Sequence, residues 1–276
     1  MICRRYGKKR LSRRMREIFP LIRRKIGEKM KKIAFYGKGG IGKSTTVSNV
    51  AAALAKKGYK VFQVGCDPKS DSTVMHNGGK RSATVLGCIR AGGGEDESEF
   101  LFRGTSGVFC MEAGGPQPGT GCAGRGIIAA FERISELNIY EKYSPDFVLF
   151  DVLGDVVCGG FAMPLRGGYA DEVYIVTSGE MMSLYAAENI VRAVKNIGNP
   201  CRALLKGIIV NKKNIEKEEE KVAAASEEMG VPVFFTLPRS IEVQKAEALG
   251  KTVVEAFPGS EMCAEYEKLA EKIARG

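Results

Sequence analysis

The sequence GKGGIGKS, residues 37–44, is the most informative stretch of this chain. It follows a short apolar run at 32–37 and opens a helical pattern at 43–57. This is the strand–loop–helix context that a phosphate-binding G-x-x-x-x-G-K-[ST] pattern requires. Glycines let backbone N–H groups converge on phosphate oxygens, and the helix N-terminus adds partial positive charge. We therefore predict a nucleotide phosphate site, whose glycines are Gly37, Gly39, Gly40 and Gly42.

Three side chains of this phosphate loop (residues 37–44) carry the expected chemistry. Lys43 is expected to reach the β- and γ-phosphates, and the Ser44 hydroxyl to ligate Mg²⁺. The additional Lys38 makes the loop resemble the deviant Walker A loop of the dimeric partition-type and nitrogenase-iron-protein ATPases. In that superfamily the early lysine reaches the nucleotide of the partner chain. The resemblance implies that hydrolysis needs two chains face to face, with Lys38 in the part of an arginine finger.

Short apolar runs alternate with helical patterns along the rest of the chain. The runs are continuous rather than alternating, as in strands that are covered on both faces. We expect strands at 32–37, 60–65, 107–112, 147–151, 172–178, 206–211 and 232–237, and helices at 43–57, 124–137, 181–196, 216–229, 240–250 and 261–275. This order predicts one α/β domain over 30–276, a doubly wound and mostly parallel sheet of the P-loop NTPase type with helices on both faces. The Gly-rich stretch 77–107 shows little periodicity.

The net charge of +10 is confined to one end of the chain. Twelve of the 42 Lys and Arg residues and two of the 32 acidic residues lie in residues 1–29, so the remainder is neutral. This basic N-terminal extension is compatible with an arm for polyanions, with an export signal that begins at SRR (12–14), or with sequence upstream of a start at Met30. An export signal would need an apolar segment of about 7–15 residues, and none is present. We expect residues 1–29 to lie outside the fold.

Composition also bounds partners and location. A neutral body gives no sign of nucleic-acid binding, and no run of 18 uncharged apolar residues exists, so we expect no membrane span. Eight cysteines in 276 residues are too few for a disulfide scaffold. Without a secretory signal they indicate a reducing compartment, and we expect a cytoplasmic protein.

Two further acidic loops follow predicted strands. GCDPKSD (65–71) ends the second strand and DVLGD (151–155) ends the fourth, at the same edge of the sheet as the phosphate loop. Asp67 and Asp151 are candidates for positioning Mg²⁺ and its waters, and Asp155 for orienting the attacking water. An aspartate at a strand end is also a common helix cap or turn former.

Two cysteines lie in glycine-rich surroundings, Cys122 in GCAGRG and Cys158 in DVVCGG. Their spacing of 36 residues fits neither a zinc C-x-x-C pair nor a ferredoxin run. Two thiolates from each chain of a symmetric dimer would complete the four ligands of an iron–sulfur cluster. Asp151 and Cys158 are at most about 25 Å apart along the chain, so one segment links nucleotide and cluster. The remaining cysteines, for which we expect no ligand role, are Cys3, Cys66, Cys88, Cys110, Cys201 and Cys263.

Five segments closely resemble the nitrogenase iron protein family: YGKGGIGKSTT (36–46), GCDPKSDST (65–73), EAGGPQPGTGCAGRG (112–126), DVLGDVVCGGFAMP (151–164) and SGEMMSLYAAENI (178–190). The resemblance runs from about 30 to 260. It implies a homodimer with one bridging 4Fe-4S cluster and MgATP in each subunit, which receives electrons from a ferredoxin or flavodoxin. Such a dimer passes single low-potential electrons to a larger catalytic component, coupled to ATP hydrolysis.

The resemblance also implies roles for individual positions. Cys122 and Cys158 match the cluster ligands, and Arg125 matches an arginine that some members carry as a site of ADP-ribosylation or docking. Asn211, Pro238 and Gln244 match contacts to adenine. The positions that match nucleotide or switch residues are Lys38, Lys43, Ser44, Thr45, Asp67, Lys69, Asp71, Asp151 and Asp155.

Several departures leave the exact partner open. Ser240 stands where the family usually has Asp, the 74–106 segment is shorter, and the basic extension is additional. Relatives with the same sites serve reductases of tetrapyrrole precursors or of small thioethers, although DVLGDVVCGGFAMP favours the nitrogenase branch. Two other classes share the loop: a cluster-free partition or positioning ATPase, and an iron–sulfur scaffold ATPase, which would be expected to use a C-x-x-C motif that is absent here. We expect His76 to be a loop residue rather than a ligand, and Met181 and Met182 to pack in the core.

Overall fold

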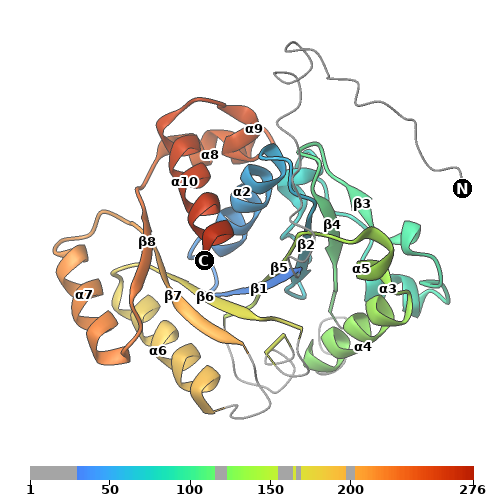
Figure 1. The fold of residues 1–276 in the computed structure, drawn as a ribbon, viewed down its shortest axis with the longest axis horizontal. Coiled ribbons are helices and arrows are strands. Elements are labelled where there is room, and N and C mark those ends of the chain that lie inside the picture. Colours follow the sequence, from blue (N-terminus) through green and yellow to red (C-terminus); the bar gives the residue numbers. More distant parts are fainter. Residues whose placement is uncertain (1–29, 116–122, 155–163, 166–168, 197–202) are drawn as a thin grey trace, which may run out of the picture.

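A computed structural model describes residues 30–115, 123–154, 164–165, 169–196 and 203–276 (Figure 1). Eight strands form one sheet in the order β3-β4-β2-β5-β1-β6-β7-β8. β3 is antiparallel to β4, and the other pairs are parallel. The strands are β1 (Lys31–Tyr36), β2 (Val61–Cys66), β3 (Phe102–Arg103), β4 (Phe109–Glu112), β5 (Phe147–Val152), β6 (Glu172–Thr177), β7 (Leu204–Asn211) and β8 (Val233–Leu237).

Helices cover both faces of the sheet (Figure 1). One face carries α2 (Lys43–Lys56), α8 (Ile241–Ala248), α9 (Val253–Ala256) and α10 (Glu261–Arg275). The other carries α3 (Val85–Arg90), α4 (Ala123–Glu136), α5 (Ile139–Tyr143), α6 (Met181–Asn196) and α7 (Glu218–Met229). Two short 3₁₀ turns, η1 (Val74–His76) and η2 (Glu97–Glu99), lie between β2 and β3.

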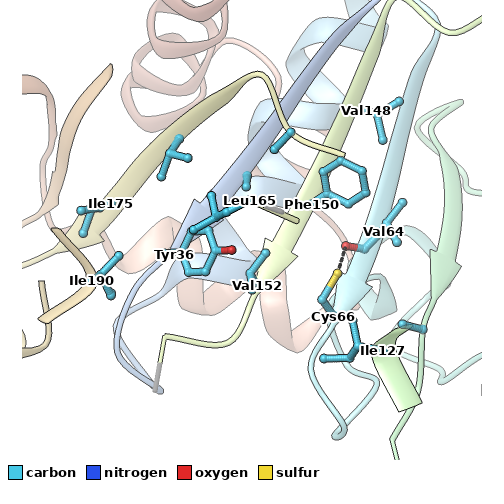
Figure 2. Close-up of a cluster of buried hydrophobic side chains, with 14 of the residues drawn as sticks. Tyr36, Val64, Cys66, Ile127, Val148, Phe150, Val152, Leu165, Ile175 and Ile190 are labelled. Atoms are coloured by element: carbon cyan, nitrogen blue, oxygen red, sulfur yellow. Dashed lines mark hydrogen bonds between the residues drawn. The ribbon is translucent and has the colours of Figure 1, made fainter. Parts of the chain in front are cut away.

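The core consists of two layers, one on each side of the sheet. Figure 2 shows part of the layer under α4 and α6, where Ile127 of α4 lies near Cys66 of β2, and Ile190 of α6 lies near Ile175 of β6. In the other layer α2 is buried along most of its length, because it lies between the sheet and α10. A helix enclosed in this way needs apolar or small residues all round, which explains the sequence VAAALA at 50–55. Side chains of β1, the strand that leads into the phosphate loop, are buried in both layers.

The predicted fold class is confirmed, since the sheet is mostly parallel and helices cover both of its faces. Sequence analysis missed β3, α3, α5 and α9, which have at most six residues each. Two turns of helix are too short for a 3.6-residue periodicity to stand out. In the least periodic stretch, α3 depends instead on a cap, because Thr84 Oγ1 accepts a hydrogen bond from Gly87 N at 3.0 Å.

The prediction that Met181 and Met182 pack in the core is wrong. Met181 is 67% exposed and Met182 is 60% exposed at the start of α6. An amphipathic helix buries only one stripe, and here that stripe is formed by Ala187, Ile190 and Val191. The two methionines lie at the first turn of α6, outside this stripe.

Candidate nucleotide site

The phosphate loop joins the end of β1 to the start of α2. Gly40 and Gly42 have φ of 77° and 91°, which is the left-handed region that residues with a Cβ avoid. A Cβ on Gly42 would also collide with the side-chain amide of Asn211. That amide donates a hydrogen bond to Ile41 O at 2.7 Å, so the end of β7 holds the loop in place. The backbone N–H groups at the start of α2 are therefore fixed toward the space in front of the helix.

Two more glycines allow the backbone to pack closely behind the loop. A Cβ on Gly37 would collide with the carbonyl oxygen of Val176 in β6. A Cβ on Gly154 would collide with the carbonyl oxygen of Gly37. The segment that follows β5 thus lies directly on the phosphate loop, and any displacement of one acts on the other.

Lys43 and Asp151 form a buried ion pair at the base of the loop. Lys43 is the first residue of α2, and Asp151 lies in β5 with a fully buried side chain. Asp151 Oδ2 has no hydrogen-bond partner among the described residues. A buried ion pair is costly to leave incomplete. The lysine has the reach to exchange this carboxylate for a phosphate, and the free oxygen of Asp151 suits a water bound to Mg²⁺.

A cavity of about 510 Å³ opens in front of the loop. Its lining contains six basic side chains and three acidic ones, and this balance suits a polyphosphate. Arg239 and Lys213 lie on its far side, where Arg239 Nη1 donates a hydrogen bond to Lys213 O at 3.0 Å. The lining includes these residues of the predicted site: Lys38, Gly39, Gly40, Gly42, Lys43, Ser44, Thr45, Asp67, Lys69, Asp71, Asn211, Pro238 and Gln244.

The sequence at 67–71, here called the DPKSD loop, forms one wall of this cavity. Asp67 Oδ1 accepts a hydrogen bond from Lys69 N at 2.9 Å, and Ser70 has a φ of 52°. Asp67 therefore closes the turn, as an Asx residue does, while Asp67 and Asp71 are both only partly buried. The Lys69 side chain is exposed. Turn formation and a metal-facing role are compatible here, because the second carboxylate oxygen of Asp67 takes no part in the turn bond.

Ser240 begins the wall that faces the DPKSD loop across the cavity. It is the N-cap of α8, and its Oγ accepts a hydrogen bond from Glu242 N at 3.1 Å. Serine and aspartate are comparable N-caps. The departure from the family's usual aspartate at this position thus keeps the helix start that places Gln244.

Sequence analysis did not find a buried polar network that lies behind the DPKSD loop. Gln63 in β2 donates hydrogen bonds to Ser48 Oγ at 3.0 Å and to Ser72 O at 2.8 Å. Its Oε1 lies 3.0 Å from His76 Nε2, and Ser106 Oγ lies 2.6 Å from His76 Nδ1. The prediction that His76 is no metal ligand is not tested, but its side chain is buried rather than in an open loop. A glutamine inside a continuous apolar strand was the signal for this network.

Three residues of the predicted site cannot be placed. Cys122, Cys158 and Asp155 are outside the described residues. Arg125 is exposed on the first turn of α4. Within the part of the chain that the structure describes, no group of three or more His, Cys, Asp or Glu side chains could hold a metal ion. The described cysteines are free thiols, of which Cys66, Cys110 and Cys263 are buried and Cys88 is partly buried.

Residues 31–276 match the family of 4Fe-4S iron–sulfur cluster binding proteins described as the NifH/frxC family. The chain belongs to this family. It is 52% identical over 88% of its length to the nitrogenase iron protein of Methanospirillum hungatei, of which it also covers 88%. It is 47% identical over 90% of its length to nitrogenase iron protein 2 of Paenibacillus durus, and covers 85% of that protein.

Solved structures confirm the P-loop ATPase type of fold for this NifH/frxC-family chain. The cell division ATPase MinD of Pyrococcus furiosus superposes with a TM-score of 0.68 at 20% identity, over 90% of this chain and 99% of that one. A ParA family ATPase from Chlorobium tepidum gives a TM-score of 0.69 at 20% identity, over 89% of this chain and 99% of that one. At this level of identity the likeness concerns the fold alone. Among the described helices, none has the length and apolar character needed to cross a membrane.

Proposed function

We propose that this protein is an ATP-dependent one-electron reductase, which donates electrons to a nitrogenase or nitrogenase-like catalytic component. The observation that carries the proposal is the identity of 52% with a nitrogenase iron protein over nearly the whole fold. The cavity supports the ATP-dependent part of the proposal, since it brings a P-loop lysine, a hydroxyl for Mg²⁺ and the carboxylates of Asp67 and Asp71 to one sheet edge. The family binds 4Fe-4S clusters, and the bound cluster supplies the transferred electron.

The nucleotide chemistry follows from the chain's own residues. Backbone N–H groups of the phosphate loop and Lys43 hold the phosphates, while Ser44 binds Mg²⁺. With nucleotide bound, Lys43 would exchange Asp151 for phosphate, and the Asp151 carboxylate would then be placed to hold a water of the Mg²⁺. Asp155 orients the attacking water, and Lys38 of the second chain stabilises the charge that develops during hydrolysis. The remaining nucleotide and switch residues are Thr45, Asp67, Lys69, Asp71 and Asp151. The residues that face the adenine are Asn211, Pro238 and Gln244.

The assembly that we propose is a homodimer with MgATP in each subunit. Cys122 and Cys158 of both chains hold one 4Fe-4S cluster between the subunits. The segment after Asp151 links nucleotide to cluster, because it rests on the phosphate loop at Gly154 and reaches Cys158 four residues later. Arg125 lies three residues after Cys122 and serves docking or modification. The upstream electron donor is a ferredoxin or flavodoxin, and the working compartment is the cytoplasm.

Anaerobic purification with iron analysis tests this proposal. We expect about four iron atoms per dimer, because a 4Fe-4S cluster needs four cysteine thiolates. The iron should be lost in Cys122→Ala and in Cys158→Ala. Cys88→Ala is the matched control, since Cys88 is a partly buried free thiol, and it should keep the iron. Iron-free wild-type protein that still hydrolyses ATP would contradict the proposal and favour a positioning ATPase.

A second candidate is the iron protein of a tetrapyrrole or thioether reductase, which would use the same nucleotide and cluster sites. The named relatives at 47–52% identity favour the nitrogenase branch. Transfer of electrons to a nitrogenase catalytic component separates the two candidates.

A further inference from the structure

Glu112 is a buried acidic residue that none of the roles above uses. It is the last residue of β4, its side chain is 1% exposed, and it pairs in register with Gly65 of β2. Gly65 pairs on its other side with Asp151 of β5. In a parallel sheet, registered neighbours point to the same face, so Glu112 and Asp151 flank Gly65 on the face that α2 covers. A glutamate buried inside a protein is almost always paired with hydrogen-bonding or charged groups.

The partner of Glu112 is Thr73, two residues after the DPKSD loop. Glu112 Oε1 accepts hydrogen bonds from Thr73 N and from Thr73 Oγ1, both at 2.7 Å. A Cβ on Gly65 would collide with the Glu112 carboxyl, so the glycine makes the space in which this carboxyl lies. The bond therefore spans from β4 across β2 to the end of the nucleotide-facing loop.

The carboxyl is held in its neutral form. Burial, with a smaller contribution from the nearby Asp151 and Asp71, raises the pKa of Glu112 to about 8, against the lowering effect of the two hydrogen bonds from Thr73. Because Oε1 accepts both bonds, the proton belongs on Oε2, which has no partner among the described residues. A neutral carboxyl has nearly the same shape as a glutamine amide, and both offer an acceptor oxygen beside a donor group.

The strand that carries Glu112 continues toward the cluster segment. Ala113 N donates to Gly65 O at 2.8 Å, Leu86 N donates to Ala113 O at 3.1 Å, and Arg90 Nη1 donates to Gly115 O at 2.9 Å. These bonds hold residues 113–115 against β2 and α3. Cys122 follows Glu112 by ten residues in the sequence.

We propose that Glu112 is a positioning residue that ties the DPKSD loop, through Thr73, to the strand leading to Cys122. It forms a second link between nucleotide and cluster, separate from the segment after Asp151. A movement of the DPKSD loop on nucleotide exchange pulls on the end of β4 through two short hydrogen bonds to one carboxyl. The role of this link in coupling nucleotide to cluster rests on the proposed function, whereas the hydrogen bonds between Thr73 and Glu112 are a property of the fold.

Thr73→Val tests the link, because valine keeps the shape of threonine and removes the hydroxyl donor. Thr105→Val is the matched control: it removes a Thr–Glu hydrogen bond of the same 2.7 Å length, to Glu255, away from this path. The first readout is hydrogen exchange in peptides covering 67–77 and 108–115, with saturating MgATP and without nucleotide. The second is the MgATP-induced increase in the rate at which a chelator removes the cluster iron.

In wild-type protein and Thr105→Val, MgATP should change exchange in both peptides. In Thr73→Val the change should persist at 67–77 and shrink at 108–115, and the increase in chelation rate should fall by about 2- to 30-fold. Glu112→Gln should retain wild-type behaviour and Glu112→Leu should lose it, which a purely space-filling role does not predict. Equal responses of Thr73→Val and wild type in both peptides would overturn the inference. A wild-type protein without any MgATP effect on chelation would instead count against the proposed function, while the exchange data still decide on the link.

Discussion

Replacement of His76 by glutamine should change how the stability of this protein depends on pH. His76 is the only histidine of the chain, and its side chain is 1% exposed. Ser106 donates to Nδ1 and the Nε2–H donates to Gln63 Oε1, so the ring is held as the neutral tautomer with its proton on Nε2. Burial lowers the pKa of His76 from 6.5 to about 4. A glutamine offers one donor and one acceptor to the same two partners.

The size of the effect follows from linkage. Because the folded pKa is depressed, the unfolded chain binds a proton between pH 6.5 and pH 4 while the folded protein does not. The contribution of His76 to stability is therefore complete above pH 6.5 and is lost as the pH falls, by about 1.4 kcal/mol per pH unit and about 3.4 kcal/mol in all. That is a large share of a typical free energy of unfolding of about 5–15 kcal/mol. Glu112, whose pKa is raised, makes the free energy of unfolding depend on pH in the opposite direction. This effect is the same in wild type and His76→Gln, so it cancels in the difference between their free energies of unfolding.

Urea unfolding at several pH values between 5 and 7.5 measures this effect. The difference in free energy of unfolding between wild type and His76→Gln should be constant above pH 6.5. It should shift by about 2 kcal/mol in favour of the variant by pH 5. The single imidazole also gives one NMR signal, whose midpoint should lie near pH 4. Parallel stability curves, or a midpoint near 6.5, would show that His76 is not a buried neutral imidazole in the folded protein.

Three further predictions concern the packing around the nucleotide site, and urea unfolding checks each of them. Gly37→Ala should lower the free energy of unfolding by about 1–3 kcal/mol, because the added Cβ meets the backbone of Val176. Gly39→Ala is the control, since a Cβ there has open space, and it should change the free energy of unfolding by less than about 0.5 kcal/mol. Similar losses in the two variants would contradict the close packing of Gly37 against Val176. Lys43→Met should cost about 3–5 kcal/mol because it strands the buried Asp151, and Asp151→Leu in the same chain should restore much of the loss; additive losses would argue against a paired buried charge. Ser240→Ala should cost about 1 kcal/mol and Ser240→Asp almost nothing, since serine caps α8; an equal cost for both would rule out the cap.

The fold could be predicted from the sequence because local patterns and global architecture agree. Continuous apolar runs such as 147–151, which are short and alternate with helical patterns, predict buried strands of a sheet covered on both faces, and a glycine-rich loop after the first of them specifies a phosphate site. The residues that line the cavity follow from this, since loops after parallel strands meet at one edge. Pro238 and Gln244, far away in sequence, were found only through the family resemblance.

The buried polar groups could not be predicted, because they depend on tertiary contacts. Nothing local marks Glu112 as buried, since its partner Thr73 lies 39 residues away. His76 is likewise read as a loop residue until Gln63 and Ser106 are seen on both sides of its ring. The prediction for Met181 and Met182 was wrong because it relied on a local property. Apolar character alone does not say whether a residue at the start of a helix is buried or exposed.

Electron transfer to a nitrogenase catalytic component is the decisive test of the proposed ATP-dependent reductase. The reduced protein is mixed with that component in a stopped-flow instrument, and oxidation of the iron–sulfur cluster is followed by its visible absorbance. We expect rapid single-electron oxidation with MgATP, and none with MgADP or in Lys43→Met. Oxidation at the same rate without ATP, or no oxidation under any condition in protein that carries its full iron content, would contradict the proposed function.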